Sequence, residues 1–272
     1  MSLSIQTNIA AMDAHRNLVG TSNSLAQSME RLSSGYRINT AADDAAGLAI
    51  SEKLGAQVSG LQQAQMNAQD AVSLVQTADG AMNEVQSMLQ RVRDLAVEYN
   101  NGTLSSSDQA AITNEVAQLC AEISQIAGQT KFNGIALLSG GGAITFQVGA
   151  DDGETLSVNA LKLFGSGSGF SIDSGIFTFG SGTVTLASID SAIDSVSTAR
   201  STFGAVQNRL QHTLNNLSIY QENLSASQSQ IKDVDMASEM VNFTKLQVLQ
   251  QAGTAMLAQA NSSQQSVLRL LQ

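Results

Sequence analysis

Apolar side chains recur in alternating steps of four and three residues along most of the chain, which is the spacing of helices packed side by side in a coiled coil. The longest series begins at Leu54 and, with one slipped step, continues through Val58, Leu61, Gln65, Ala68, Val72, Val75, Ala78, Met82, Val85, Leu89, Val92, Ala96 and Tyr99. It predicts one helix over about 43–100. At 1.5 Å per residue such a helix is about 87 Å long, so it needs a partner along its length.

Two later segments keep the same spacing and provide such partners. A shorter helix is predicted from Ile112, Val116, Leu119, Ile123 and Ile126. A long one is predicted from Ile189, Ile193, Val196, Phe203, Leu210, Leu214, Leu217, Leu224 and Ile231, with the polar residues Arg200, Gln207, Gln221 and Gln228 in the same seam. We therefore expect three helices side by side, the two long ones antiparallel.

The two ends of the chain carry helical patterns of a different kind, over about 4–33 and 235–271. The C-terminal segment has one apolar stripe formed by Leu246, Leu249, Met256, Ala260, Val267 and Leu270, and another formed by Val248, Ala252 and Ala255. A helix that is apolar on more than one side is buried from several directions. The N-terminal segment offers only Leu18, Leu25, Met29 and Leu32 as cover. The uncovered surface predicts packing against other copies of the chain.

The middle of the chain has strand-like patterns and many glycines. Residues 143–149 and 155–158 flank Asp151-Asp152-Gly153, which predicts a β-hairpin. Glycines at 165–169 and the segment 177–186 predict a further turn and ribbon. The fold class is therefore mainly α, a long antiparallel coiled-coil of N- and C-terminal segments with a small β-rich hairpin insert. The expected divisions are a terminal helix over 1–40 paired with 235–272, rod helices over 41–130 and 188–234, and the insert over 131–187.

Turn residues mark the expected ends of these helices. Thr40 and Asp43 fit a capping box that starts the long helix, and Asn100-Asn101-Gly102 tolerates the left-handed backbone that ends one. Asp233-Val-Asp235 precedes a new apolar pattern and predicts that a helix restarts there.

Composition supports a helical chain and excludes several classes of partner. None of the 272 residues is proline, which would break a helix, and only 4% are aromatic. A net charge of −10 argues against nucleic-acid binding, which needs clustered Lys and Arg. Residues 246–268 lack charge, but seven Asn and Gln amides among them argue against membrane insertion. The first residues lack the basic and apolar regions of a secretory signal peptide, so we expect none to be cleaved.

Reactive side chains are few and scattered. His15 and His212 have no metal-ligand spacing, and Cys120 is expected to be a small buried hydrophobe beside a helix seam. Asp43 and Asp44 are adjacent, so on a helix they point about 100° apart and cannot share a proton as a catalytic pair does. We therefore predict no catalytic residues, no metal, no cofactor and no enzyme activity.

Several segments closely resemble bacterial flagellins, and in the same order. They are Leu32–Ser51 (LSSGYRINTAADDAAGLAIS), Gln90–Val97, Phe132–Leu138, Phe146–Ala150, Gly204–Leu210, Glu222–Ser227 and Leu249–Asn261. The resemblance spans nearly all of the chain outside about 151–203. It implies an extracellular structural subunit that polymerises into the helical flagellar filament for swimming, with the terminal helices forming an inner tube. The alternative is a hook–filament junction protein of the same terminal-helix architecture.

The resemblance also implies partners. They are many copies of the chain itself, a flagellar export chaperone that holds the C-terminal helix, and the filament cap and hook-associated proteins. Export is expected through the flagellum's own type III secretion channel. A vertebrate innate immune receptor is a further expected partner, because Arg91, Leu95 and Glu115 match the surface that such receptors sense in flagellins. The alternative for Arg91 and Glu115 is that they pair at a seam between subunits.

Overall fold

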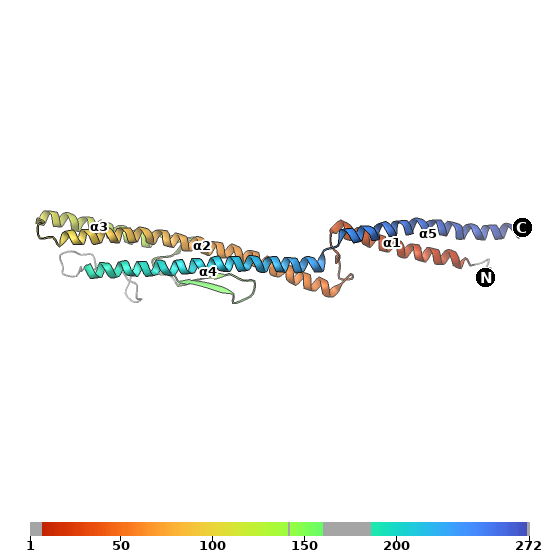
Figure 1. Ribbon diagram of the computed structural model, residues 1–272, viewed down its shortest axis with the longest axis horizontal. Coiled ribbons are helices and arrows are strands. Elements are labelled where there is room, and N and C mark those ends of the chain that lie inside the picture. Colours follow the sequence, from red (N-terminus) through yellow and green to blue (C-terminus); the bar gives the residue numbers. More distant parts are fainter. Residues whose placement is uncertain (1–6, 141, 160–185, 271–272) are drawn as a thin grey trace. The chain divides into compact units, whose positions relative to one another are not determined.

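The computed structural model describes residues 7–140, 142–159 and 186–270, with side chains described as far as residue 263 (Figure 1). The described residues form five helices, α1 (Ile9–Ser34), α2 (Ala45–Tyr99), α3 (Ser106–Gln129), α4 (Leu186–Lys232) and α5 (Met236–Leu270). They also form four short strands, β1 (Lys131–Phe132), β2 (Ile135–Ala136), β3 (Ala143–Gln147) and β4 (Thr155–Asn159). The predicted fold class, mainly α with a small β-rich insert, is confirmed.

The chain divides into two compact units. We call Met1–Ala56 with Asn223–Gln272 the terminal unit, and Gln57–Glu222 the central unit. Both divisions fall inside long helices, since α2 and α4 each contribute residues to both units.

The core of the central unit lies along α2, which is buried on two sides. The predicted seam positions Leu61, Ala68, Val75, Ala78, Met82, Val85, Leu89, Val92 and Ala96 are buried, and so is a second row formed by Ala64, Ala71, Leu74 and Leu95. The helix has two buried rows because both α3 and α4 pack against it. From α3 come Ile112, Val116 and Ile123, and from α4 come Ile189, Val196, Phe203 and Leu210.

Polar residues in the seam of α4 find partners on α2. The Arg200 guanidinium donates to the Asp79 carboxylate at 2.9 Å and to the Gln86 amide oxygen at 2.6 Å. The Gln65 amide donates to Gln221 at 2.9 Å. Among the described residues, no buried side-chain N or O atom is left without a hydrogen-bond partner. These pairs fix the register of the two helices, because a shift would leave part-buried polar groups unpaired.

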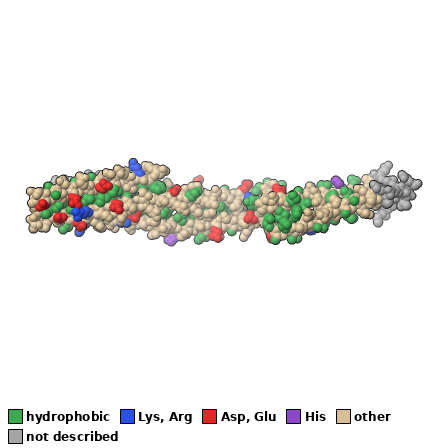
Figure 2. Space-filling model, turned by 90° about the horizontal axis from the view of Figure 1, so that it is seen from above, with side chains coloured by type: hydrophobic (Ala, Val, Ile, Leu, Met, Phe, Trp, Pro, Cys, Tyr) green, Lys and Arg blue, Asp and Glu red, His purple; other side chains and the backbone are tan. Residues whose placement is uncertain are grey.

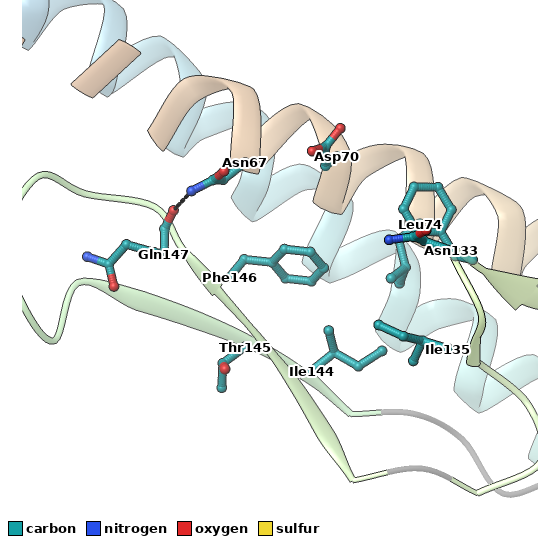
Figure 3. A pocket seen from close by; sticks show the side chains of 10 residues that line it. Asn67, Asp70, Leu74, Asn133, Ile135, Ile144, Thr145, Phe146 and Gln147 are labelled. Carbon is teal, nitrogen blue, oxygen red and sulfur yellow. Dashed lines mark hydrogen bonds between the residues drawn. The ribbon is translucent and has the colours of Figure 1, made fainter. Parts of the chain in front are cut away.

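The predicted hairpin is present. β3 and β4 pair antiparallel, with Ala143 opposite Asn159 and Gln147 opposite Thr155, and Gly153 in the connecting turn has a φ of 94°. Leu156 and Val158 are buried against the helical core, and Ile144 and Phe146 pack against it from β3. The Asn67 amide of α2 donates to the Gln147 carbonyl at 3.0 Å at one end of an open groove of about 350 Å³ between α2 and the strands (Figure 3). The second predicted ribbon, over 165–186, lies almost wholly outside the described residues.

A second hairpin, β1–β2, was not predicted. Its turn is Asn133-Gly134, with φ values of 48° and 81°. Positive φ at both central residues is what a two-residue type I′ turn requires, and Asn-Gly is its strongest sequence signal. The signal was therefore present in the sequence, although the strands it joins have only two residues each.

Two predicted helix ends differ in detail. Asp44, and not Thr40, caps α2, because its Oδ1 accepts from the Gly47 N–H at 2.9 Å. Asp43 instead closes the preceding turn, where its Oδ2 accepts from the Thr40 N–H and hydroxyl, each at 3.0 Å. The predicted helix end at residues 100–102 is confirmed, since α2 ends at Tyr99, but it is not made by a left-handed residue. Asn133 is the only non-glycine residue of the described chain with positive φ, and Gly102 is not among the glycines that have it.

Candidate assembly surface on the terminal helices

In the terminal unit, α1 and α5 pack as an antiparallel pair (Figure 1). The Asn8 amide donates to the Ala260 carbonyl at 3.1 Å, and the Ser28 hydroxyl donates to the Glu239 carboxylate at 2.5 Å. The start of each helix therefore lies beside the end of the other. Asp235 caps α5, since its Oδ1 accepts from the Ala237 N–H at 2.9 Å, which confirms the predicted restart.

The seam between these helices follows a heptad pattern but is thin. Its residues are Ala11, Ala14, Leu18, Thr21, Leu25, Ser28 and Leu32 of α1, and Glu239, Phe243, Leu246, Gln250, Gly253, Leu257 and Ala260 of α5. Many are small or polar, and a Cβ at Gly253 would lie 3.2 Å from Leu18 Cδ1. Ser28 and Glu239 are buried, whereas the apolar seam residues are only half-buried. The pair is closely spaced and buries little apolar area.

Large apolar side chains of the terminal unit lie mostly on its surface. Over its described residues, Ile38 is the only hydrophobic side chain that is fully buried. The exposed ones on the two helices are Ile9, Met12, Val19, Met29, Met236, Met240, Val241, Val248, Leu249 and Met256, with exposed fractions of 46–67%. Figure 2 shows hydrophobic side chains gathered over the end of the pair where α1 ends and α5 begins. The described part of the central unit has the opposite distribution, because its large apolar residues are mostly buried or partly buried and few are exposed.

These exposed residues lie on faces that their own pair does not cover. Val241 and Val248 are seven residues apart and each follows a seam residue of α5 by two positions. That position points outward in a coiled coil and is usually polar. Leu249 and Met256 instead border a groove of about 400 Å³, whose other wall includes Ala14, Asn17, Leu18 and Thr21. Apolar surface is thus present on more than one side of α5, as its sequence predicts.

The residues predicted for self-assembly separate into three groups. Leu18, Leu25, Leu32 and Leu246 lie in the seam of their own chain. Met29, Leu249 and Met256 are exposed by 55%, 46% and 64%, respectively. The side chains of Val267 and Leu270 lie outside the described residues. The sequence analysis missed the exposed residues Ile9, Met12, Val19, Met236, Met240 and Val241. A seven-residue spacing links Met12 with Val19 and Val241 with Val248.

The three residues predicted for receptor contact are not all on the surface. Arg91 of α2 donates through Nη2 and Nε to Glu115 of α3, at 2.7 and 2.9 Å. Hydrogen bonding to this carboxylate raises the pKa of Arg91. The pair therefore joins two helices of one chain. Leu95 is 2% exposed and belongs to the core, so the folded chain does not present its side chain to a partner.

The structure does not bring together the side chains that were considered as metal ligands or nucleophiles. His15 and His212 are exposed, and Cys120 is half-buried beside the core, where desolvation raises its pKa to about 12. Within the described ranges, no three His, Cys, Asp or Glu residues come together in a way that would hold a metal ion. The helices, as far as they are described, include none long and apolar enough to cross a membrane.

Comparison with known proteins identifies the family. Residues 5–143 match the model of the bacterial flagellin N-terminal helical region, and residues 186–271 match that of the C-terminal helical region. The chain belongs to the bacterial flagellin family. As a flagellin, it is a structural subunit of the flagellar filament. The two matched regions contain all five helices and leave the β3–β4 hairpin and the following segment between them.

Similar flagellins extend over the same length. The chain is 48% identical to a flagellin of Halalkalibacterium halodurans, over 98% of this chain and 99% of that one. It is 42% identical to a flagellin of Bacillus subtilis, with the same coverage of both chains. A solved Vibrio parahaemolyticus protein, named as flagellar hook-associated, covers 70% of this chain and 100% of its own with a TM-score of 0.60. At 16% identity that likeness shows the fold alone, and nothing favours the hook–filament junction alternative.

Proposed function

We propose that this flagellin is held in its filament by the exposed apolar residues of α1 and α5, which pack against the same helices of neighbouring copies. The observation that carries the proposal is the distribution of apolar residues between the two units. In the described part of the central unit the large apolar side chains are mostly buried or partly buried and few are exposed, whereas the described terminal unit buries only Ile38 fully and exposes ten large apolar side chains on two helices.

Burial of this surface supplies a driving force for association. Covering apolar area contributes about 25 cal/mol per Å², or roughly 1.5–3 kcal/mol for each large side chain fully buried. The exposed residues lie on more than one side of the pair, so one symmetric contact between two copies cannot cover them all. Contacts between different faces of successive copies do not close on themselves, and they generate a helical filament.

The remaining partners are part of the same proposal, and family membership is their support. A chaperone that holds α5 before export would cover the apolar faces that later contact other copies. Passage through the flagellum's own channel, without a cleaved signal, would place the chain outside the cell. Cap and hook-associated proteins would then meet the ends of the filament. For an immune receptor, Arg91 and Glu115 are accessible at 54% and 45% of their side-chain surface, while Leu95 would contribute only as support from the core.

Substitution of Val248 tests the proposed surface directly. Its side chain is 64% exposed in the single chain, so Val248→Asp should leave the helical circular dichroism of the monomer unchanged. In the filament the carboxylate would be buried without a partner, and we expect no polymers after seeding. Val248→Leu is the matched control, because it keeps an apolar side chain, and it should polymerise. Filaments of Val248→Asp in electron micrographs, formed at the wild-type critical concentration, would contradict the proposal.

A further inference from the structure

Methionine is unusually placed in this chain. Of its nine methionines, five lie on the surface of α1 and α5, which are Met12, Met29, Met236, Met240 and Met256, with exposed fractions between 48% and 64%. In the central unit Met82 is fully buried, Met88 is partly buried, and Met66 is 52% exposed. Exposed thioethers therefore concentrate on the helices that carry the proposed assembly surface.

The exposed methionines occupy several faces of the helix pair. Met29 and Met240 directly follow Ser28 and Glu239, whose side chains are hydrogen-bonded across the seam, so they flank the seam at the same level. Met256 borders the groove that also contains Leu18 and Leu249. Met12 follows the seam residue Ala11. A chemical change at these sulfurs would therefore alter more than one contact between copies.

We propose that these five methionines are modification sites, at which a peroxide oxidises the thioether to a sulfoxide and so prevents the chain from joining a filament. The inference rests on the proposed function of α1 and α5. In the reaction the sulfur attacks one peroxide oxygen, the O–O bond breaks, and an S=O bond forms. The sulfur loses two electrons to the peroxide, which leaves as water, and no other reactant is needed. A sulfoxide reductase reverses the change.

Oxidation of these methionines should weaken assembly but leave the fold of the single chain unchanged. A sulfoxide is polar, and covering it without a hydrogen-bond partner costs enough to raise the critical concentration by about tenfold or more. In the monomer the same group stays in water, since each side chain is about half exposed or more. Cys120 carries the chain's only thiol, and it is half-buried in the central unit, where burial raises its pKa to about 12, so little of it is the reactive thiolate.

The test compares oxidation before and after assembly of the full-length chain. Monomer is treated with dilute hydrogen peroxide until peptide mass spectrometry shows oxidation at the five positions, freed of peroxide and seeded. We expect unchanged circular dichroism, a critical concentration at least about tenfold higher by sedimentation, and recovery after methionine sulfoxide reductase treatment. Filaments assembled first and then given the same peroxide should be oxidised more slowly at these five positions than the monomer is.

Leucine variants identify the responsible residues. The combined variant Met12→Leu, Met29→Leu, Met236→Leu, Met240→Leu and Met256→Leu keeps apolar volume and should assemble after peroxide treatment. Met66→Leu alone should remain sensitive. Oxidised wild-type monomer that assembles at the untreated critical concentration would overturn the inference, and so would equal peroxide sensitivity of the five-leucine variant. If that variant does not assemble untreated, the wild-type comparison still decides the outcome. The proposed function fails separately, through the Val248 variants, which involve no oxidation.

Discussion

Leu89 offers the sharpest test of the core of the central unit. Its side chain is 0% exposed and lies on α2, in the stretch that packs against both α3 and α4. Leu89→Ala removes three carbon groups, and at about 0.8 kcal/mol each their burial accounts for ~2.4 kcal/mol. A cavity of that size, ~70 Å³ if nothing collapses into it, adds up to ~1.7 kcal/mol at ~24 cal/mol per Å³. We therefore expect Leu89→Ala to lower the free energy of unfolding by about 2–4 kcal/mol.

The assay is urea unfolding of the monomer, followed by helical circular dichroism. The transition of the central unit should move to lower urea with an unchanged slope, because the surface exposed on unfolding stays nearly the same. Val97→Ala is the matched control, since it lies on the same helix but is 51% exposed, and it should change stability by no more than about 0.5 kcal/mol. A Leu89→Ala shift no larger than that of Val97→Ala would refute the reasoning, because the seam would then not be a packed core.

Two further predictions concern titratable groups. Burial raises the pKa of Cys120 to about 12, so alkylation by iodoacetamide at pH 8 should be slower in the folded monomer than in urea by roughly two to three powers of ten; equal rates would mean that the thiol is not buried. Hydrogen bonds from the Ser105 side chain and backbone N–H lower the pKa of Asp108. The stability they confer is present above the unfolded pKa and is lost as the pH falls through the lowered folded value. The advantage of the wild type over Ser105→Ala, measured as the urea midpoint, should therefore shrink below about pH 4, and a pH-independent difference would contradict this account.

The helices and most of the core follow from the sequence because their signal is local and repeated. Each seam position of α2 from Leu61 to Ala96 is one more instance of the same spacing, so a single misleading residue does not hide the pattern. The Asp151-Asp152-Gly153 turn is likewise a local signal flanked by strand-forming residues. The ends of α2 were less predictable, because Thr40, Asp43 and Asp44 all have side chains that cap helices, and the choice depends on which backbone N–H groups are free.

The faces of α5 were the least predictable part of the candidate site. Its sequence shows that Leu246, Val248, Leu249 and Met256 are apolar, but not which of them faces α1. That choice depends on the register of the pair, which is fixed by contacts between residues more than two hundred positions apart, such as Ser28 with Glu239. Leu95 was expected on a surface because it matches a residue that receptors sense in flagellins. In the folded chain, packing against the other helices of the central unit buries it.

The two units use the same heptad spacing with different results, and the difference accounts for the proposed division of roles. In the central unit α2 is covered by two further helices and a hairpin, so large apolar residues at seam positions become fully buried. In the terminal unit α1 and α5 pack mainly against each other, and their seam contains Ala, Ser, Thr, Gln and Gly. Such a pair gains little stability by itself. Binding to other copies then stabilises the folded terminal helices by mass action, so we expect their stability to rise with assembly while that of the central unit depends mainly on its own core.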